Sequence, residues 1–310
     1  TSNTINLYGD SDGDGVNDLG VSAPGAAMKS TPAGSSPGLA GKVYVFSGAD
    51  ISTVTDPDDA IVIIEGLDDY HVGENLSSQT DINGDGLGDL VSYGANTRNP
   101  DVNMALLYGG SSVAGEVVWD DFDATWWYEC GDMPRYTYYT PTCDVESYSP
   151  SDPGGADTWA NAASGAADFN GDGYDDLAAA DKFYDSEDYD QVGRAWILFG
   201  KSIEFNHSDA SLNSTATVVM TGTADKHYFG AMIGAVPDVD GDGDDELLIM
   251  DPSVNDMYFF LGGIDLEIGG YDLADVDAII EGVGSPPSSI VNVGDWTGDG
   301  LDDVALAYGA

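Results

Sequence analysis

The sequence predicts an all-β fold, a β-propeller whose blades are four-stranded antiparallel sheets. Three observations lead to this prediction. One Asp- and Gly-rich pattern occurs five times in the 310 residues, and short apolar segments of strand composition flank the copies. Successive copies begin 57 to 87 residues apart, a spacing typical of four-stranded propeller repeats. No long segment has the apolar periodicity of an amphipathic helix.

The repeated pattern has the composition of a calcium-binding loop. We call the copies loop 1 (10–18), loop 2 (81–89), loop 3 (168–176), loop 4 (238–246) and loop 5 (295–303). Oxygen-bearing side chains stand at positions 1, 3, 5 and 9 of every copy, and Gly at positions 4 and 6. Calcium binds about six to eight oxygens, and the carbonyl of position 7 can add one. The expected ligands are Asp10, Asp12, Asp14, Val16, Asp18; Asp81, Asn83, Asp85, Leu87, Asp89; Asp168, Asn170, Asp172, Tyr174, Asp176; Asp238, Asp240, Asp242, Asp244, Glu246; and Asp295, Thr297, Asp299, Leu301, Asp303.

Two other kinds of loop share part of this composition. Asp and Gly favour ordinary surface turns, but five copies with the same glycines and oxygens favour Ca²⁺, at about five sites. A helix–loop–helix site needs a Glu at position 12. This chain has Val21, Ser92, Ala179, Ile249 and Leu306 there. Because strand-like residues follow each loop, the loops are predicted to lie inside β-hairpins.

Each repeat is expected to contribute four strands in the same order. The first strand precedes the loop and the second follows it. The third is aromatic and aliphatic and ends before a Gly, and the fourth is short and mostly apolar. Third strands are expected at 41–46, 104–108, 194–199 and 257–261, and fourth strands at 60–64, 124–128, 216–220 and 278–280. The whole chain, 1–310, is thus one propeller-like domain with units at about 1–66, 67–128, 159–222, 223–282 and 283–310.

The last unit holds only two of its four strands, so the predicted blade is incomplete. Unpaired strand edges tend to pair with another chain. Either further chain completes the propeller, which we favour, or a neighbouring subunit supplies the missing strands.

An insertion at 128–158 interrupts the repeats and contains both cysteines, Cys130 and Cys143. A disulfide is favoured over two free thiols, because it fits an oxidising exterior. The aromatic residues Trp126, Trp127, Tyr136, Tyr138 and Tyr139 are candidates for a partner contact. A protein contact is preferred over a glycan site, and simple packing of the two tryptophans is the competing explanation.

Charge and motif content exclude several classes of function. The chain carries 56 acidic and 8 basic residues, a formal net charge of −48. Nucleic acid binding requires a basic surface, so it is not expected. Calcium would offset only part of this acidity, and a salt-rich habitat or further surface cations would account for the rest. No apolar run is long enough for membrane insertion.

No enzymatic motif stands out. There is no Gly-x-Ser-x-Gly or phosphate-binding loop. The histidines His71, His207 and His227 share no spacing typical of a metal site or a catalytic triad. His71 and His227 occupy the same place in their units, which indicates a packing role.

The layout resembles the FG-GAP repeat of integrin α-subunit propellers and their bacterial, secreted relatives. Phe229-Gly230 stands nine residues before Asp238, and Val72-Gly73 stands at the same distance before Asp81. Parts of a Gly-Ala-Pro element follow the second strands at 23–24, 94–95 and 251–252. Trp159-Ala160, before Asp168, departs from the pattern. The resemblance implies structural Ca²⁺ in the hairpin between the first two strands of each blade.

The function expected from these features is that of an extracellular or cell-surface protein. It would be stabilised by calcium and act in adhesion or as a structural, self-associating subunit. A carbohydrate-binding module that uses the aromatic insertion is the alternative. An enzyme is not expected.

Overall fold

The computed structural model describes residues 5–27, 40–66, 72–93, 104–110, 115–118, 124–127, 162–201, 207–263, 269–283 and 287–308, apart from single residues and pairs inside these ranges. The described elements are almost all β-strands. The exceptions are two 3-10 turns, Ile51–Thr53 and Pro57–Asp59, and one short helix, α1 (Leu212–Thr215). The prediction of an all-β protein is therefore confirmed.

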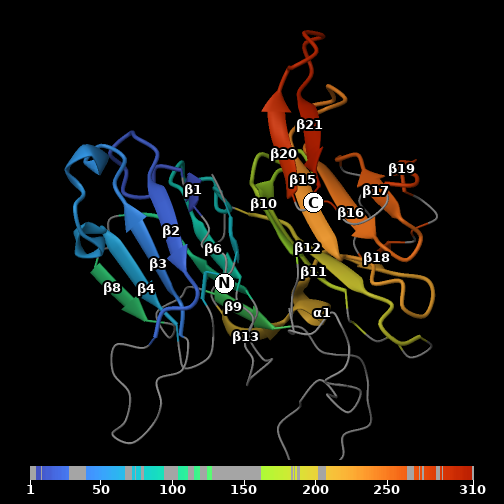
Figure 1. The fold of residues 1–310 in the computed structure, drawn as a ribbon, viewed down its shortest axis with the longest axis horizontal. Helices are drawn as coiled ribbons and strands as arrows, with labels where there is room; N and C mark the ends of the chain where they lie inside the picture. The colour runs from blue at the N-terminus through green and yellow to red at the C-terminus, as the bar shows by residue number, and fades with distance from the viewer. Residues whose placement is uncertain are drawn as a thin grey trace, which may run out of the picture.

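Four antiparallel ladders follow one another along the chain (Figure 1). The first is β1 (Ile5–Leu7), β2 (Leu19–Ala23), β3 (Lys42–Phe46) and β4 (Val62–Glu65). The second is β5 (Asn75–Leu76), β6 (Leu90–Tyr93), β7 (Met104–Leu107) and β9 (Ala124–Trp127). The third is β10 (Ala162–Ala167), β11 (Asp176–Asp181), β12 (Arg194–Leu198) and β14 (Val218–Thr221). The fourth is β15 (Met232–Val236), β16 (Glu246–Asp251), β17 (Asp256–Phe260) and β19 (Ala278–Ile280).

Three of these ladders gain a fifth strand that the sequence did not predict. β8 (Gly115–Val118) pairs in parallel with β4, β13 (His207–Ser211) with β9, and β18 (Gly269–Tyr271) with β14. Each of these strands lies in the chain between the third and fourth strands of the following ladder. β13 and β18 are polar or Gly-rich, so they lack the apolar pattern by which a strand is recognised. Each fifth strand therefore pairs with the sheet that precedes its own unit, which links neighbouring sheets. Closure of the sheets into a propeller remains a prediction.

The core lies between the sheets in successive clusters. Leu106 and Ile82 pack with Trp196 and Leu177 between the second and third sheets. The first and second sheets share a cluster of Val45, Ile64, Leu90, Leu107 and others. The third and fourth share Phe169, Phe229, Ile249 and Phe260. Because neighbouring sheets cover both faces of the inner strands, all six residues of β11 are buried, and strict apolar–polar alternation is not needed there.

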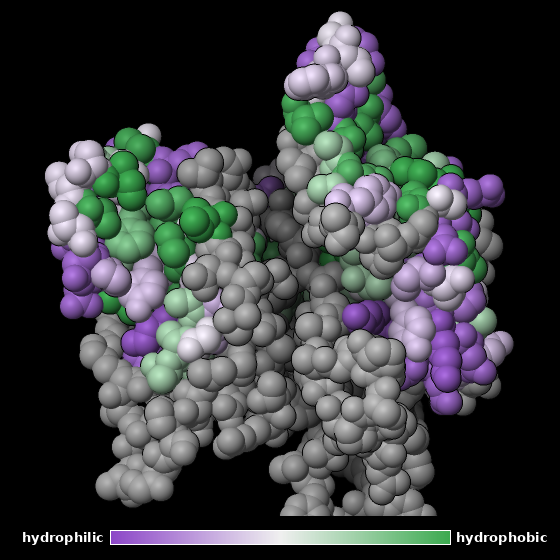
Figure 2. Space-filling view, viewed as in Figure 1, coloured by the Kyte–Doolittle hydropathy of each residue, from purple (hydrophilic) through white to green (hydrophobic). Residues whose placement is uncertain are grey.

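The last hairpin, β20 (Ser289–Gly294) and β21 (Asp303–Ala307), packs against the fourth sheet and projects beyond it (Figure 1). Ile290 contributes to this contact, beside Gly234 of β15. The outer part of the hairpin is open to solvent, and the Trp296 side chain at its tip is 83% exposed. Figure 2 shows hydrophobic residues along the hairpin below a more hydrophilic tip.

Several predictions concern residues outside the described part of the chain. These are the disulfide of Cys130 and Cys143 and the partner contacts of Tyr136, Tyr138 and Tyr139. Trp126 and Trp127 lie in β9, between β13 and β7 of its sheet, but the placement of their side chains is outside what the structure describes.

Candidate metal centre

All five loops join two antiparallel strands, as the sequence predicted, and backbone amides fix the first side chain of each loop. In loop 3 the carboxylate of Asp168 accepts the amides of Asp172 (3.0 Å) and Gly173 (2.8 Å). In each of the other loops, the first residue also accepts backbone amides of its own loop; these residues are Asp10, Asp81, Asp238 and Asp295. Gly173 has a φ of +89°, which a side chain would strain. The glycine at position 6 therefore allows the loop to close on its first carboxylate.

Alternate side chains turn toward the inside of the loop. In loop 3, Asn170 Oδ1 accepts the Asp172 amide at 2.9 Å, and Asp172 Oδ1 accepts the Tyr174 amide at 3.0 Å. Loops 1, 2 and 4 repeat both bonds. A carboxylate has about four lone-pair directions, so these side chains keep acceptor capacity for a cation.

Position 9 has a second role that sequence reasoning missed. Asp18, Asp89 and Asp176 are fully buried, and one oxygen of each accepts the amide of position 2 of the same loop. The other oxygen accepts the amide of the Gly that follows the third strand, at 3.0 Å for Gly48, 2.9 Å for Gly109 and 2.8 Å for Gly200. Position 9 thus ties each of these loops to its own sheet. The Gly that follows each third strand is the sequence feature from which this role of position 9 could have been predicted.

Loop 4 departs from this arrangement and offers the clearest sign of a cation site. Glu246 is fully buried, and its Oε2 accepts the Val239 amide at 2.9 Å. Its Oε1 is buried with no hydrogen-bond partner. Carboxylate oxygens of Asp238, Asp240, Asp242 and Glu246 all lie within 4.8 Å of one another. A buried acceptor without a donor is costly, and a hard cation among these oxygens would satisfy it. The residues of loop 4 therefore fit Ca²⁺.

Loop 1 gathers its carboxylates similarly, with oxygens of Asp10, Asp12 and Asp18 within 4.8 Å of one another. In loops 2 and 3 an amide, Asn83 or Asn170, replaces the carboxylate of position 3. Those two loops keep the same pattern of amide bonds with one charge fewer.

Loop 5 is built differently. Asp303 Oδ2 accepts the amide of Thr297, the third loop residue, at 2.8 Å, whereas in the other loops position 9 accepts the amide of the second residue. Its hairpin packs against the fourth sheet, and its position 7 residue, Leu301, lies beside Gly241 of loop 4. Asp295 and Asp299 are exposed. Of the five loops, loop 5 is therefore expected to bind a cation most weakly. The neutral side chain of Thr297 also indicates this.

Loops 1 to 4 lie side by side, and each consecutive pair of them is joined by backbone bonds. Position 8 donates its amide to the carbonyl of position 1 of the preceding loop: Gly88 to Asp10 (2.9 Å), Asp175 to Asp81 (3.2 Å) and Asp245 to Asp168 (2.9 Å). The side chain of position 7 covers the Gly at position 4 of the preceding loop. A Cβ on Gly84 would lie 2.5 Å from the Tyr174 ring, and one on Gly171 would lie 1.9 Å from Asp244 Oδ1. A side chain at Gly84 or Gly171 would therefore displace the covering side chain of the neighbouring loop.

Burial changes the acidity of the loop carboxyl groups in the protein without metal. It raises the pKa of Asp89 to about 7 and that of Asp176 and of Glu246 to about 8. Nearby loop carboxylates add to each increase, while amide bonds oppose it. Burial here disfavours the ionised form, and a bound cation would favour it.

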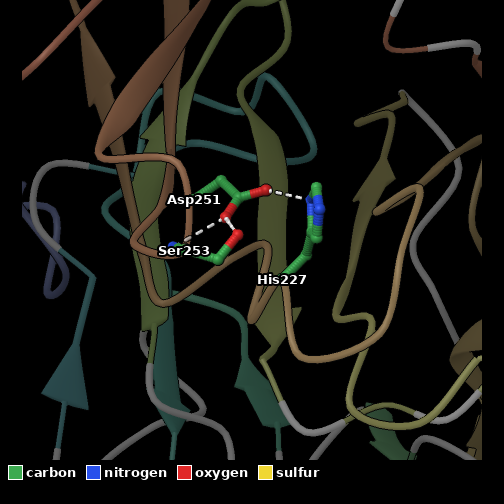
Figure 3. A network of polar contacts seen from close by, with 3 residues as sticks. All are labelled: His227, Asp251 and Ser253. Carbon is green, nitrogen blue, oxygen red and sulfur yellow. Dashed lines mark hydrogen bonds and ion pairs between the residues drawn. The ribbon is translucent and has the colours of Figure 1, made fainter.

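A His, an Asp and a Ser meet elsewhere in the fourth unit (Figure 3). Asp251, at the end of β16, is fully buried, and one of its oxygens lies 2.7 Å from His227 Nδ1. Its other oxygen accepts the Ser253 hydroxyl at 2.7 Å and the Ser253 amide at 3.0 Å. The hydroxyl donates to the carboxylate and is not bonded to the imidazole, so this is not the order of a Ser-His-Asp triad. The contact ties the segment before Phe229 to the end of β16, the place where a packing role was expected for His227.

Residues 160–198, which span loop 3 and the strands around it, match the family model described as FG-GAP repeat. This segment is therefore similar to an FG-GAP repeat. FG-GAP repeats are typical of extracellular or surface proteins, often mediate protein interactions and are generally non-enzymatic. The comparison with curated proteins gave no match. Within the described residues, no helix has the length and apolarity needed to cross a membrane.

Proposed function

We propose that this FG-GAP repeat protein is a calcium-stabilised extracellular protein that acts in adhesion or as a structural subunit. The observation that carries the proposal is loop 4, where a buried Glu246 oxygen without a donor lies in a cluster of four carboxylates. Loops 1 to 3 repeat the backbone arrangement, and all five loops have oxygen-bearing side chains at the expected ligand positions. Calcium, when bound, would supply positive charge among carboxylates that otherwise repel one another. Ion binding would therefore stabilise the folded chain.

Thermal unfolding in calcium and in EGTA tests the stabilising role. A site at a hundredfold excess of ligand over Kd adds about 2.7 kcal/mol to the free energy of unfolding. Several sites should raise Tm by about 10 °C or more. Asp240→Asn should reduce the rise, whereas Asp58→Asn, which removes the same charge from an exposed turn outside the loops, should not. Equal melting curves in calcium and EGTA would contradict the proposal.

We propose further that a protein partner binds the outer edge of the fourth sheet, which is formed by β19. β4, β9 and β14 are each covered by a parallel fifth strand, but no described strand pairs with the corresponding edge of β19. Ile279 and Ile280 of β19 are 45% and 40% exposed. Open edges with apolar side chains favour strand addition. The partner would add a strand parallel to β19, and a second copy of this chain is one source of it.

Light scattering and electron microscopy in millimolar calcium, and then in excess EGTA, test this contact. Ordered particles that form in calcium and dissociate in EGTA are expected if the partner is a second copy. Ile279→Lys should prevent their formation, while Ile51→Lys, at a residue 43% exposed in a turn of the first unit, should not. A monodisperse monomer under both conditions would exclude self-association through this edge.

A further inference from the structure

Two acidic residues that are not expected ligands connect neighbouring loops. Asp175 is the eighth residue of loop 3, and its Oδ2 accepts the amide of Asp81, the first residue of loop 2, at 2.6 Å. Asp245 is the eighth residue of loop 4, and its Oδ2 accepts the amide of Asp168, the first residue of loop 3, at 3.0 Å. With the backbone bonds in the opposite direction, each pair of loops is held by two reciprocal bonds.

Asp245 also reaches its own loop. Its Oδ1 accepts the amide of Asp238, the first residue of loop 4, at 3.2 Å. One carboxylate therefore holds the amides of the first ligand residues of two adjacent loops. A hydrogen bond to an ionised acceptor is about twice as strong as a neutral one, which makes this contact a firm connection.

The boundary between loops 1 and 2 lacks such a connection. The eighth residue of loop 2 is Gly88, whose Cα packs directly on Gly9. A Cβ on Gly88 would lie 2.7 Å from backbone atoms of Gly9, so no side chain fits there. Among the residues that the structure describes, the hydrogen bonds between loops 1 and 2 join backbone atoms only, Gly88 to Asp10 and Gly110 to Ser11.

We infer that Asp175 and Asp245 are positioning residues that couple calcium binding between loops 2 and 3 and between loops 3 and 4, whereas loop 1 binds independently. The inference rests on the calcium function proposed above. Each coupling residue directly precedes the position 9 ligand of its own loop, Asp176 or Glu246. An ion that orders that ligand also fixes the preceding carboxylate on the first residue of the neighbouring loop. By linkage, the neighbour's ion has the same effect in return.

The charges around Asp175 give the coupling a positive sign. Its carboxylate interacts unfavourably with those of Asp81, Asp168 and Asp245. Without cations, this repulsion opposes the bond to the Asp81 amide. A cation in either loop offsets part of the repulsion and so favours the arrangement that the second loop requires.

Hydrogen exchange of the full chain during a calcium titration tests the coupling, because mass spectrometry follows each loop in its own peptide. The quantity compared is the calcium concentration that gives half-maximal protection of loop 2. Asp172→Ala removes a ligand from loop 3 and should raise this concentration about five- to tenfold, within the usual range for coupled sites. Asp172→Asn, which keeps the side-chain size, serves as a second variant. In either variant, the midpoint of loop 1 should not change.

The same comparison in an Asp175→Ala background completes a double-mutant cycle. There, loss of the loop 3 ligand should leave the loop 2 midpoint unchanged. Asp175→Asn, which retains one acceptor oxygen, should restore part of the shift. Asn17→Ala is the matched control, since Asn17 is the exposed eighth residue of loop 1. Equal shifts with and without Asp175 would overturn the coupling alone. Absence of calcium-dependent protection in every loop would overturn the calcium function itself.

Discussion

The buried carboxylates at position 9 stabilise the fold and are also proposed cation ligands. Asp176 holds the amides of Phe169 and Gly200 and remains one of the expected calcium ligands. Glu246 is one methylene longer, holds a single amide, and leaves one oxygen without a donor. Glu246 therefore lacks the bond to the sheet that Asp176 makes, and one of its oxygens remains without a hydrogen bond.

Glu246→Gln should remove most of the calcium response of loop 4. The side chain keeps its length, but the charge that attracts the cation is lost. We expect the calcium-dependent gain in the free energy of unfolding to fall by about 2–3 kcal/mol at a hundredfold excess of ligand over Kd. Denaturant unfolding in calcium and in EGTA measures this difference. Glu281→Gln, at an exposed position outside the loops, is the control, and an equal loss in both variants would contradict the role of Glu246.

The raised pKa values predict an unusual dependence of stability on pH in the absence of calcium. Burial raises the pKa of Asp89 to about 7 and that of Asp176 and Glu246 to about 8, above their unfolded values. The folded chain then binds more protons than the unfolded chain between about pH 4 and 8. This contribution to stability is complete below the unfolded pKa values and is lost as pH rises through the folded ones.

In EGTA, Tm should therefore fall as the pH is raised from 5 to 8.5. In calcium, the cation holds the carboxylates in their ionised form, and the fall should disappear or reverse. Calorimetry at several pH values, with and without calcium, measures both slopes. A Tm in EGTA that rises over this range would contradict the burial of these groups in the metal-free protein.

Among the elements, the third strand and the loop of each ladder are joined at one close contact. The Gly after the strand approaches the carbonyl of the eighth loop residue so closely that a Cβ would lie 2.2 Å from it at Gly200 and 2.0 Å at Gly48. The contact brings the Gly amide to the buried carboxylate of position 9. A glycine is required there by proximity, since neither residue has a positive φ.

Gly200→Ala should therefore destabilise the chain through steric overlap with a backbone atom. We expect a loss of about 3 kcal/mol in the free energy of unfolding, toward the upper end for an overpacked site. Gly282→Ala is the comparison, because Gly282 has a φ of +71° but open space around it. Backbone strain alone should cost roughly 1–2 kcal/mol there. Denaturant unfolding in EGTA separates the two, and equal losses would contradict the close contact.

Across the whole chain, the net charge of −48 opposes the compact state. The loops concentrate this charge, since neighbouring loops lie side by side and share carboxylate interactions such as those of Asp175. Cations that bind specifically and salt that only screens should both relieve the repulsion, by different amounts at the same concentration.

Potassium chloride should raise Tm in EGTA because the Debye length falls from about 10 Å at 0.1 M to about 3 Å at 1 M. We expect an increase of several degrees over this range, and a smaller increase when calcium is present, because the bound ions have already reduced the charge. Thermal unfolding over a salt series measures both. A Tm in EGTA that is independent of salt would show that self-repulsion does not limit stability.

The five loops and the strands that flank them could be predicted from the sequence. Alternation of oxygen side chains with two glycines defined the five loops, and apolar segments placed the strands around them, because both depend on neighbouring residues. The fifth strands, the covering of position 4 by the next loop, and the bond from Asp175 to Asp81 were not readable. They join residues about 50 or more positions apart, and some involve strands such as β13 with no apolar pattern, so they depend on how the sheets pack against one another.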